Sequence, residues 1–256
     1  PRFLYNNADM VLLYWFDDHF NLRNEQRLDL KKKIEDFHRW HRKTELSKTA
    51  LFLEELRHRY IKGIKKEDIS WARVHFEELW EKVLNHIESD LVSFLLTVDG
   101  SQVLHMKMKL LEKDDLLVQK SKMDFFELHE TTLDWVYGVF EDWFGYLDPE
   151  QKTKMATWVK PDSKWIMIKL KNRKKTRDIL VRLLQSKDNL KDNLHTWIYH
   201  PEALWTDEFK VRVEEKKQEW ADFILKVDAI TLSHQRKHAA NKLQNYADDF
   251  SELSNL

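Results

Sequence analysis

The stretch Leu147-Asp148-Pro149-Glu150-Gln151 is a complete helix-start signal. Asp148 suits the N-cap, where its carboxylate can accept backbone N–H groups, and Pro149 suits the first helical position, where a backbone N–H would have no partner. Gln151 stands at the third position, from which its side chain can reach back to the cap. We therefore predict structural capping roles for Asp148 and Gln151.

Related signals recur along the chain. Leu22-Arg23-Asn24-Glu25-Gln26 follows Asp17-Asp18-His19-Phe20, much as the first stretch follows Glu141-Asp142-Trp143-Phe144, with one extra residue in the second turn. The segment 98–102 has the same form, and 230–235 fits it with the glutamine one place late. Two explanations are open: a duplication that gives related halves at 1–120 and 121–256, or a chance match of common capping residues.

The composition agrees with a helical protein. The 256 residues include only four Gly and four Pro, whereas an all-β fold needs more turn residues. We predict an all-α fold, an antiparallel helical bundle built as one continuous domain or as two related helical halves packed together. The first helix covers the apolar run 10–16 and the second carries a stripe from Leu30 to His41. Further helices are expected at about 45–62, 66–88, 100–119, 122–145, 149–159, 164–186, 202–228 and 233–253.

Charge and cysteine content exclude several classes of function. The formal net charge is −1, so no overall field favours nucleic acid or an anionic membrane. The basic run 169–175, flanked by Trp165 and Arg177, is typical of a solvated helix face, with nucleic acid or acidic lipid as the alternative; we expect no nucleic acid partner. The absence of cysteine excludes disulfides and thiolate metal sites.

The opening block joins Tyr5-Asn6-Asn7-Ala8-Asp9 to the apolar run Met10–Phe16 and the pair Asp17-Asp18. Asn6 and Asp9 have the spacing of a capping box, and a helix that is apolar all round is expected to be buried. The run is far shorter than the roughly 20 residues that cross a bilayer. Asp17 and Asp18 would lie at the amino end of the next helix, so we predict structural capping roles for both.

A turn at residues 21–24 would fold the second helix back along the first. At 1.5 Å rise per residue, this brings residues 5–7 beside residues 37–42. The arrangement could be an anion or carbohydrate pocket, or a satisfied polar network that holds the amino-terminal helix in place. The candidate ligand-binding residues are Tyr5, Asn6, Asn7, Asp9, His38, Trp40, His41, Arg42 and Glu45.

No catalytic residue, metal or cofactor is assigned from the sequence. The chain has no nucleophile elbow and no glycine-rich phosphate loop. His38 with His41, and His234 with His238, have the spacing of ligands on one helix face, but exposed helix histidines are the simpler account. Eleven tryptophans exceed the needs of the core, and the pairs Trp135/Trp143, Trp158/Trp165 and Trp197/Trp205 could line a groove for peptides or glycans.

Over about residues 3–56 the chain resembles an uncharacterised family of bacterial lipoproteins of the outer-membrane type. The shared features are the segment 5–9, the pair Asp17-Asp18, the turn at Glu25-Gln26 and the segment His38–Leu46. The resemblance implies a periplasmic protein that is anchored to a membrane through a lipid-modified cysteine a few residues upstream of residue 1. It implies no activity.

A weaker similarity is to the periplasmic chaperones that carry Leu-Thr-x-x-Gln repeats and cradle unfolded chains. Leucine and glutamine have the required spacing at Leu22/Gln26 and Leu147/Gln151, but Arg23 and Asp148 stand where threonine is expected. Because the motif is largely capping physics, the match can also be convergent.

The sequence thus predicts a non-enzymatic periplasmic lipoprotein that binds an envelope protein, an unfolded client or a cell-wall polymer, in a chaperone-like manner. The alternative is a metal-dependent or hydrolytic enzyme centred on Asn6, Asp9, His38, His41 and Glu45.

Overall fold

The computed structural model describes residues 2–255. The structure is 87% helical. This described part contains no strand, so the predicted all-α fold is confirmed. Its helices are α1 Arg2–Asn6, α2 Ala8–Phe20, α3 Asn24–Thr44, α4 Leu46–Ile61, α5 Lys66–Thr97, α6 Gly100–Ser121, α7 Phe125–Phe144, α8 Pro149–Trp158, α9 Ser163–Ser186, α10 Leu190–Tyr199, a 3-10 turn Pro201–Leu204, α11 Asp207–Ala229 and α12 Ser233–Ser254.

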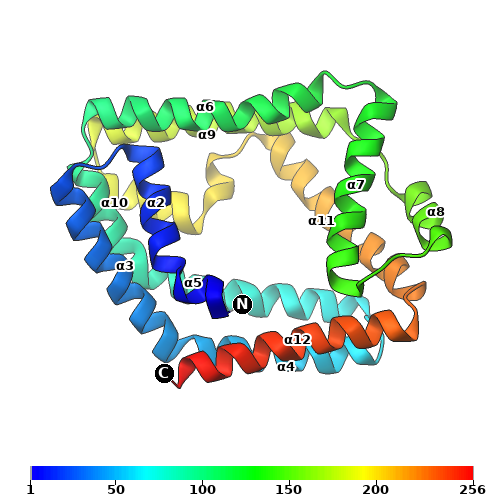
Figure 1. The fold of residues 1–256 in the computed structure, drawn as a ribbon. Helices are drawn as coiled ribbons and strands as arrows, with labels where there is room; N and C mark the ends of the chain where they lie inside the picture. Colours follow the sequence, from blue (N-terminus) through cyan, green and yellow to red (C-terminus); the bar gives the residue numbers. More distant parts are fainter. Residues whose placement is uncertain (1, 256) are drawn as a thin grey trace.

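The helices form the four sides of a frame (Figure 1). Helix α6 packs along α9 on one side, and α4 packs along α12 on the opposite side, each pair antiparallel. Helices α3 and α10 lie at one end of the frame, and α7, α8 and α11 at the other, while the long helix α5 begins near α11 and ends beside α10. Both long sides join elements from before and after residue 120, and the division at that residue stays a prediction.

The frame has two corners at which the turns of two helical hairpins meet. At the one we call the second corner, the α7–α8 turn meets the α11–α12 turn, and two buried glutamine side chains form hydrogen bonds with each other. Gln151 Nε2 donates to Gln235 Oε1, and Gln235 Nε2 donates to Gln151 Oε1, both at 2.8 Å. Each amide also donates to the turn opposite, Gln151 to the carbonyl of Ile230 and Gln235 to that of Tyr146. The capping geometry expected for Asp148 and Gln151 is present, with the N–H of Asp148 donating to Gln151 Oε1.

The first corner, where the α2–α3 turn meets the α5–α6 turn, repeats this arrangement. Gln26 and Gln102 exchange amide hydrogen bonds of 3.1 and 2.8 Å. Gln26 Nε2 also donates to the carbonyl of Thr97, and Gln102 Nε2 to that of Phe20. Each of the four glutamines therefore caps the start of its own helix and also donates a hydrogen bond to a backbone carbonyl in the turn of another hairpin.

The apolar core has two parts, one beneath each corner. The first includes Phe20, Phe94 and Val98 together with Leu184 and Leu194 from α9 and α10. The second surrounds Phe144, Leu147, Met155, Val227 and Leu243, with Tyr60 of α4 packed among them. Each core draws on helices from distant parts of the chain, so the corners fix the sides of the frame as well as their own hairpins.

The two corners also end their first helices alike. The residue after α2 is Asn21, with φ 48°, and the residue after α7 is Gly145, with φ 82°. Both lie in the left-handed region, which glycine and asparagine tolerate best. At Gly145 a Cβ atom would meet the ring of His238 at 3.5 Å, an ordinary van der Waals contact, so the positive φ rather than lack of space favours glycine there.

Several predicted boundaries were wrong. Helix α5 continues to Thr97, nine residues beyond the expected end, and α10 was missed. Helix α11 begins at Asp207 because the 3-10 turn occupies Pro201–Leu204. In the last repeat, Leu232 is the N-cap and Gln235 is the third helical residue, so this glutamine is in register with the others and is not one place late.

The largest correction concerns the apolar run after Asp9, which was expected to be buried. Only one side of α2 packs into the first core, through Leu13, Phe16 and Phe20. The exposed fractions of Met10, Val11 and Tyr14 are 61%, 61% and 72%. A helix without a polar side carries no signal for the direction it will face, so the sequence pattern could not resolve this.

Replacing Gln235 by alanine should lower the free energy of unfolding by about 3 kcal/mol. It removes the partner of the Leu232 N–H and of the Tyr146 carbonyl, and it leaves the buried amide of Gln151 with one of its two hydrogen bonds at each atom. Urea unfolding followed by circular dichroism measures this. The matched control is Gln119→Ala on the exposed surface of α6, for which we expect a change within about 0.5 kcal/mol. Equal effects of the two substitutions would contradict the role given to the glutamine pair.

Candidate functional site

The amino-terminal helices rest on α3 through a group of polar side chains that we call the amino-terminal cluster: Tyr5, Asn6, His38, His41 and Arg42. The hydroxyl of Tyr5 and Nδ1 of His41 form a hydrogen bond of 3.0 Å. The Tyr5 ring also packs against the ring of His38, with centroids 4.6 Å apart. The predicted return of the second helix thus brings residues 5 and 6 beside residues 38–42.

Two guanidinium groups complete the attachment. Arg42 donates to Oδ1 of Asn6 at 2.7 Å and lies over the ring of Tyr5, 5.5 Å from its centroid. Arg2 pairs with Asp249 and Glu252 near the end of α12. Helix α1 is therefore attached by polar contacts to α3 and to the last helix of the chain.

Burial controls the ionisation of the cluster. It raises the pKa of Tyr5 to about 12, so the phenol stays protonated at neutral pH. It also lowers the pKa values of His38 and His41. The positive charge of Arg42 lowers the pKa of His38 further. Both imidazoles are thus biased toward the neutral form, which suits the hydrogen bond from the Tyr5 hydroxyl.

Three polar atoms at this site are shielded from solvent and have no hydrogen-bonding partner among the described residues: Oδ1 of Asp9, Nε2 of His38 and Oε2 of Glu45. The other carboxylate oxygen of Glu45 pairs with Lys48 at 2.7 Å. Buried polar atoms usually have partners, so these three are the strongest indication that the cluster could contact a further group. The ligand-binding role of the cluster stays a prediction.

Two of the predicted ligand-binding residues, Asn7 and Trp40, make contacts outside the amino-terminal cluster, and one predicted capping box is absent. The amide of Asn7, the residue between α1 and α2, donates to the carbonyl of Phe3 in α1. The ring of Trp40 stacks on His86 of α5, with centroids 3.7 Å apart, and so takes part in the α3–α5 contact. Asn6 and Asp9 form no capping box, because Asn6 is the last residue of α1 and its side chain binds Arg42.

The two acidic residues at the end of α2, Asp17 and Asp18, contact different helices. Asp17 accepts the N–H of Leu22 and pairs with Arg27, so it lies at the start of α3 as expected. Asp18 pairs with Lys109 of α6 at 2.9 Å and does not cap a helix. Adjacent helical residues point about 100° apart, so the two carboxylates reach different neighbours.

The polar attachment leaves an apolar surface outward. We call the exposed side chains of Phe3, Leu4, Met10, Val11 and Tyr14 the amino-terminal apolar face; all are at least 61% exposed. They belong to α1 and the amino half of α2, and their exposure sets them apart from the amino-terminal cluster and the first core. Exposed apolar side chains gathered on one short segment are typical of a surface that binds a partner.

The tryptophans named above and the basic run mostly make contacts between helices of the frame. Trp135 contacts Trp220, and Trp165 stacks on Phe209, so the pairs suggested by the sequence are not the spatial ones. In the basic run, Arg173 pairs with the buried carboxylate of Asp114, and Lys175 donates to the carbonyl of Trp205. These contacts join α9 to α6 and to the segment before α11.

Within residues 2–255, no three side chains of His, Asp and Glu gather in a way that could hold a metal ion. None of the helices described there has the length and apolarity required to cross a membrane.

The fold and site define an all-helical frame protein with two glutamine-linked corners and an exposed apolar segment at its amino end. A model of a family of unknown function, DUF6279, matches residues 18–210, and the chain belongs to that family. No curated protein and no solved structure matches the chain.

Replacing Tyr5 by phenylalanine keeps the aromatic packing on His38 but removes the hydrogen bond to His41. We expect hydrogen exchange of the α1 and early α2 amides to rise about three- to tenfold, the equivalent of one neutral hydrogen bond. The matched control is Tyr14→Phe, which removes the hydroxyl of an exposed tyrosine on the same segment. Unchanged exchange in Tyr5→Phe would show that this bond does not hold the segment.

The attachment should also weaken in acid. Because the pKa values of His38 and His41 are lower when α1 is attached than in a detached, solvated segment, the detached state binds more protons. Stability of the attached state is therefore full above about pH 6.5 and falls as the pH drops below that value. Hydrogen exchange of α1, corrected for its intrinsic pH dependence, measures this. The variant His41→Gln should show a smaller pH effect, and a wild-type profile that stays flat down to about pH 5 would contradict the expectation.

Proposed function

We propose that this protein is a non-enzymatic periplasmic lipoprotein that binds an unfolded client, an envelope protein or a cell-wall polymer in a chaperone-like manner. The observation that carries the proposal is the amino-terminal apolar face. Its side chains cover a segment that is attached to the frame by polar contacts, so they remain free to contact a partner. Burial of apolar surface stabilises a complex, and because the hydrophobic effect is not directional, clients of different shape can bind.

The glutamine corners support the chaperone-like part of the proposal. The leucine and glutamine positions of the Leu-x-x-x-Gln segments at 22–26 and 147–151 are a buried core residue and a reciprocal amide in this fold. The resemblance to the Leu-Thr-x-x-Gln chaperones therefore rests on positions with a common physical role, although the threonine is replaced. A frame fixed at its corners can present an apolar segment without collapsing around it.

The envelope location rests on the resemblance of the opening block to bacterial lipoproteins. It is tested by metabolic labelling of the full gene product, in its own host, with a radioactive fatty acid. We expect label on a cysteine that precedes residue 1 by a few positions, and loss of the label when that cysteine is replaced by serine. A gene product without such a cysteine would overturn this part of the proposal.

Replacing three of the five side chains of the amino-terminal apolar face should weaken client binding. The variant Met10→Ser/Val11→Ser/Tyr14→Ser retains the polar attachment and should reduce suppression of the aggregation of reduced insulin by about tenfold, because it removes most of the exposed apolar area of the segment. Light scattering measures the aggregation, and pulldown against envelope fractions tests for a folded partner.

The matched control changes the same number of exposed apolar side chains elsewhere on the frame: Leu51→Ser/Phe125→Ser/Val211→Ser. It should behave like the wild type in both assays. If the two variants lose activity equally, client binding depends on the exposed apolar area of the whole surface and not on the amino-terminal apolar face. If the wild type has no holdase activity and no partner at micromolar concentration, the proposal is wrong.

A further inference from the structure

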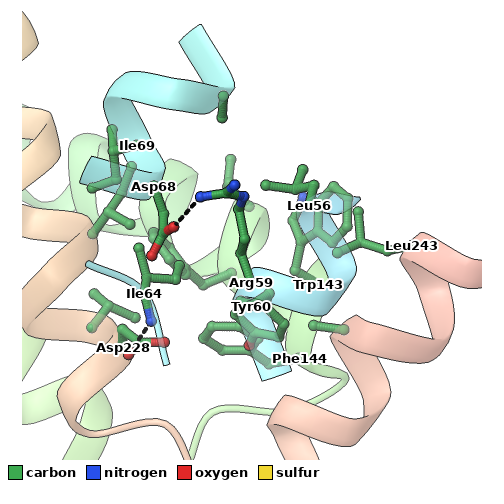
Figure 2. Close-up of a pocket in the computed structure, with 16 residues that line it drawn as sticks. Leu56, Arg59, Tyr60, Ile64, Asp68, Ile69, Trp143, Phe144, Asp228 and Leu243 are labelled. Atoms are coloured by element: carbon green, nitrogen blue, oxygen red, sulfur yellow. Dashed lines mark hydrogen bonds and ion pairs between the residues drawn. The ribbon is translucent and has the colours of Figure 1, made fainter. Parts of the chain in front are cut away.

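A separate apolar cavity lies near the second corner, between α4, α5, α7, α11 and α12 (Figure 2). Its volume is about 390 Å³. Twelve of the sixteen lining side chains are aliphatic or aromatic hydrocarbons or tryptophan, including Ile64, Phe140, Trp143, Val227 and Leu243. An engineered apolar cavity of about 150 Å³ is enough to take up benzene, so this cavity has room for a considerably larger apolar molecule.

The charged groups of the cavity are already paired. Arg59 donates to Asp68 at 2.9 Å, and its Nε pairs with Glu55 at 2.8 Å. Figure 2 shows the Arg59–Asp68 pair and, below it, the backbone N–H of Ile64 bound to Asp228, with Trp143 and Leu243 across the lining from them. Asp228 also pairs with Arg236 at 2.7 Å. A charged ligand would therefore find no unpaired counter-ion here and would lose its hydration.

Two buried polar atoms of the lining residues have no hydrogen-bonding partner among the described residues: Nε of Arg59, which is in an ion pair with Glu55, and the hydroxyl of Tyr60. Tyr60 lines the cavity and is only 8% exposed, and its hydroxyl is shielded from solvent with no hydrogen-bonding partner among the described residues. The phenol is a donor as well as an acceptor, and a donor left unsatisfied in an apolar site is unfavourable. A ligand with an acceptor oxygen would meet this need, whereas a pure hydrocarbon would not.

We propose that the cavity binds an uncharged medium-chain alkyl compound with one oxygen acceptor, such as a fatty alcohol or acyl ester. The chain fills the space between Phe140, Trp143 and Leu243, and the oxygen accepts a hydrogen bond from the hydroxyl of Tyr60. The site shares no residue with the amino-terminal apolar face, so it does not depend on the function proposed above.

The uncharged fluorescent probe N-phenyl-1-naphthylamine tests the site in the full chain. We expect binding with a dissociation constant of about 10 µM or tighter and displacement by 1-decanol. Val139→Trp, which places an indole at the cavity wall, should weaken probe binding about tenfold, as should Ala72→Leu from the α5 side. The matched control is Val74→Trp on α5, a similarly exposed valine outside the cavity, which should bind like the wild type.

Two further measurements test the chemistry of the ligand. Decanoate should displace the probe about tenfold less well than 1-decanol, since its charge has no partner in the cavity. Tyr60→Phe should weaken 1-decanol about three- to tenfold and leave the probe unaffected. Probe binding that is absent in the wild type, or unchanged in both Val139→Trp and Ala72→Leu, would overturn the proposal. If Tyr60→Phe binds 1-decanol as tightly as the wild type does, the hydrogen bond assigned to the Tyr60 hydroxyl is wrong.

Discussion

The reciprocal glutamine pair is the interaction on which the rest of the structure depends. A side-chain amide has two N–H donors and an oxygen with two lone pairs, and each of the four paired glutamines uses this full set. In Gln151, the oxygen accepts from Asp148 and from Gln235, and the nitrogen donates to Gln235 and to the carbonyl of Ile230. Glutamate has no donor, and asparagine is one carbon shorter. Because the same atoms cap a helix and join two hairpins, local and long-range order cannot be separated at the corners.

The first corner determines how the amino-terminal segment is presented. The carbonyl of Phe20 accepts from Gln102, which fixes the end of α2, and Phe16 and Phe20 bury its carboxyl half. Leu13 also packs on this core, and beyond it the residues of α1 meet the imidazoles and the Arg42 guanidinium of α3. Polar contacts with Tyr5 and Asn6 therefore hold the segment, and its apolar side chains remain outside.

The helix starts and the return of α3 along α2 could be predicted from the sequence because they depend on residues within a few positions of one another. The pairing of the glutamines could not, since Gln26 and Gln102 are 76 residues apart and Gln151 and Gln235 are 84 apart. Helix α10 was missed because it is short and begins after Asn189, which has φ 46° and provides no side-chain cap. The cavity was likewise beyond prediction, because it requires five helices to be in place.

The two apolar features of the molecule differ in shape, and shape decides what each can bind. The amino-terminal apolar face is the outer side of a helix, so a small molecule would cover only a little of it; only an extended chain or another protein surface buries enough area there. The cavity near the second corner is concave and lined by side chains from five helices, which suits a small apolar molecule. Rigid corners make both features possible, because a frame held by buried hydrogen bonds can leave apolar surface unfilled at points where a flexible bundle would close over it.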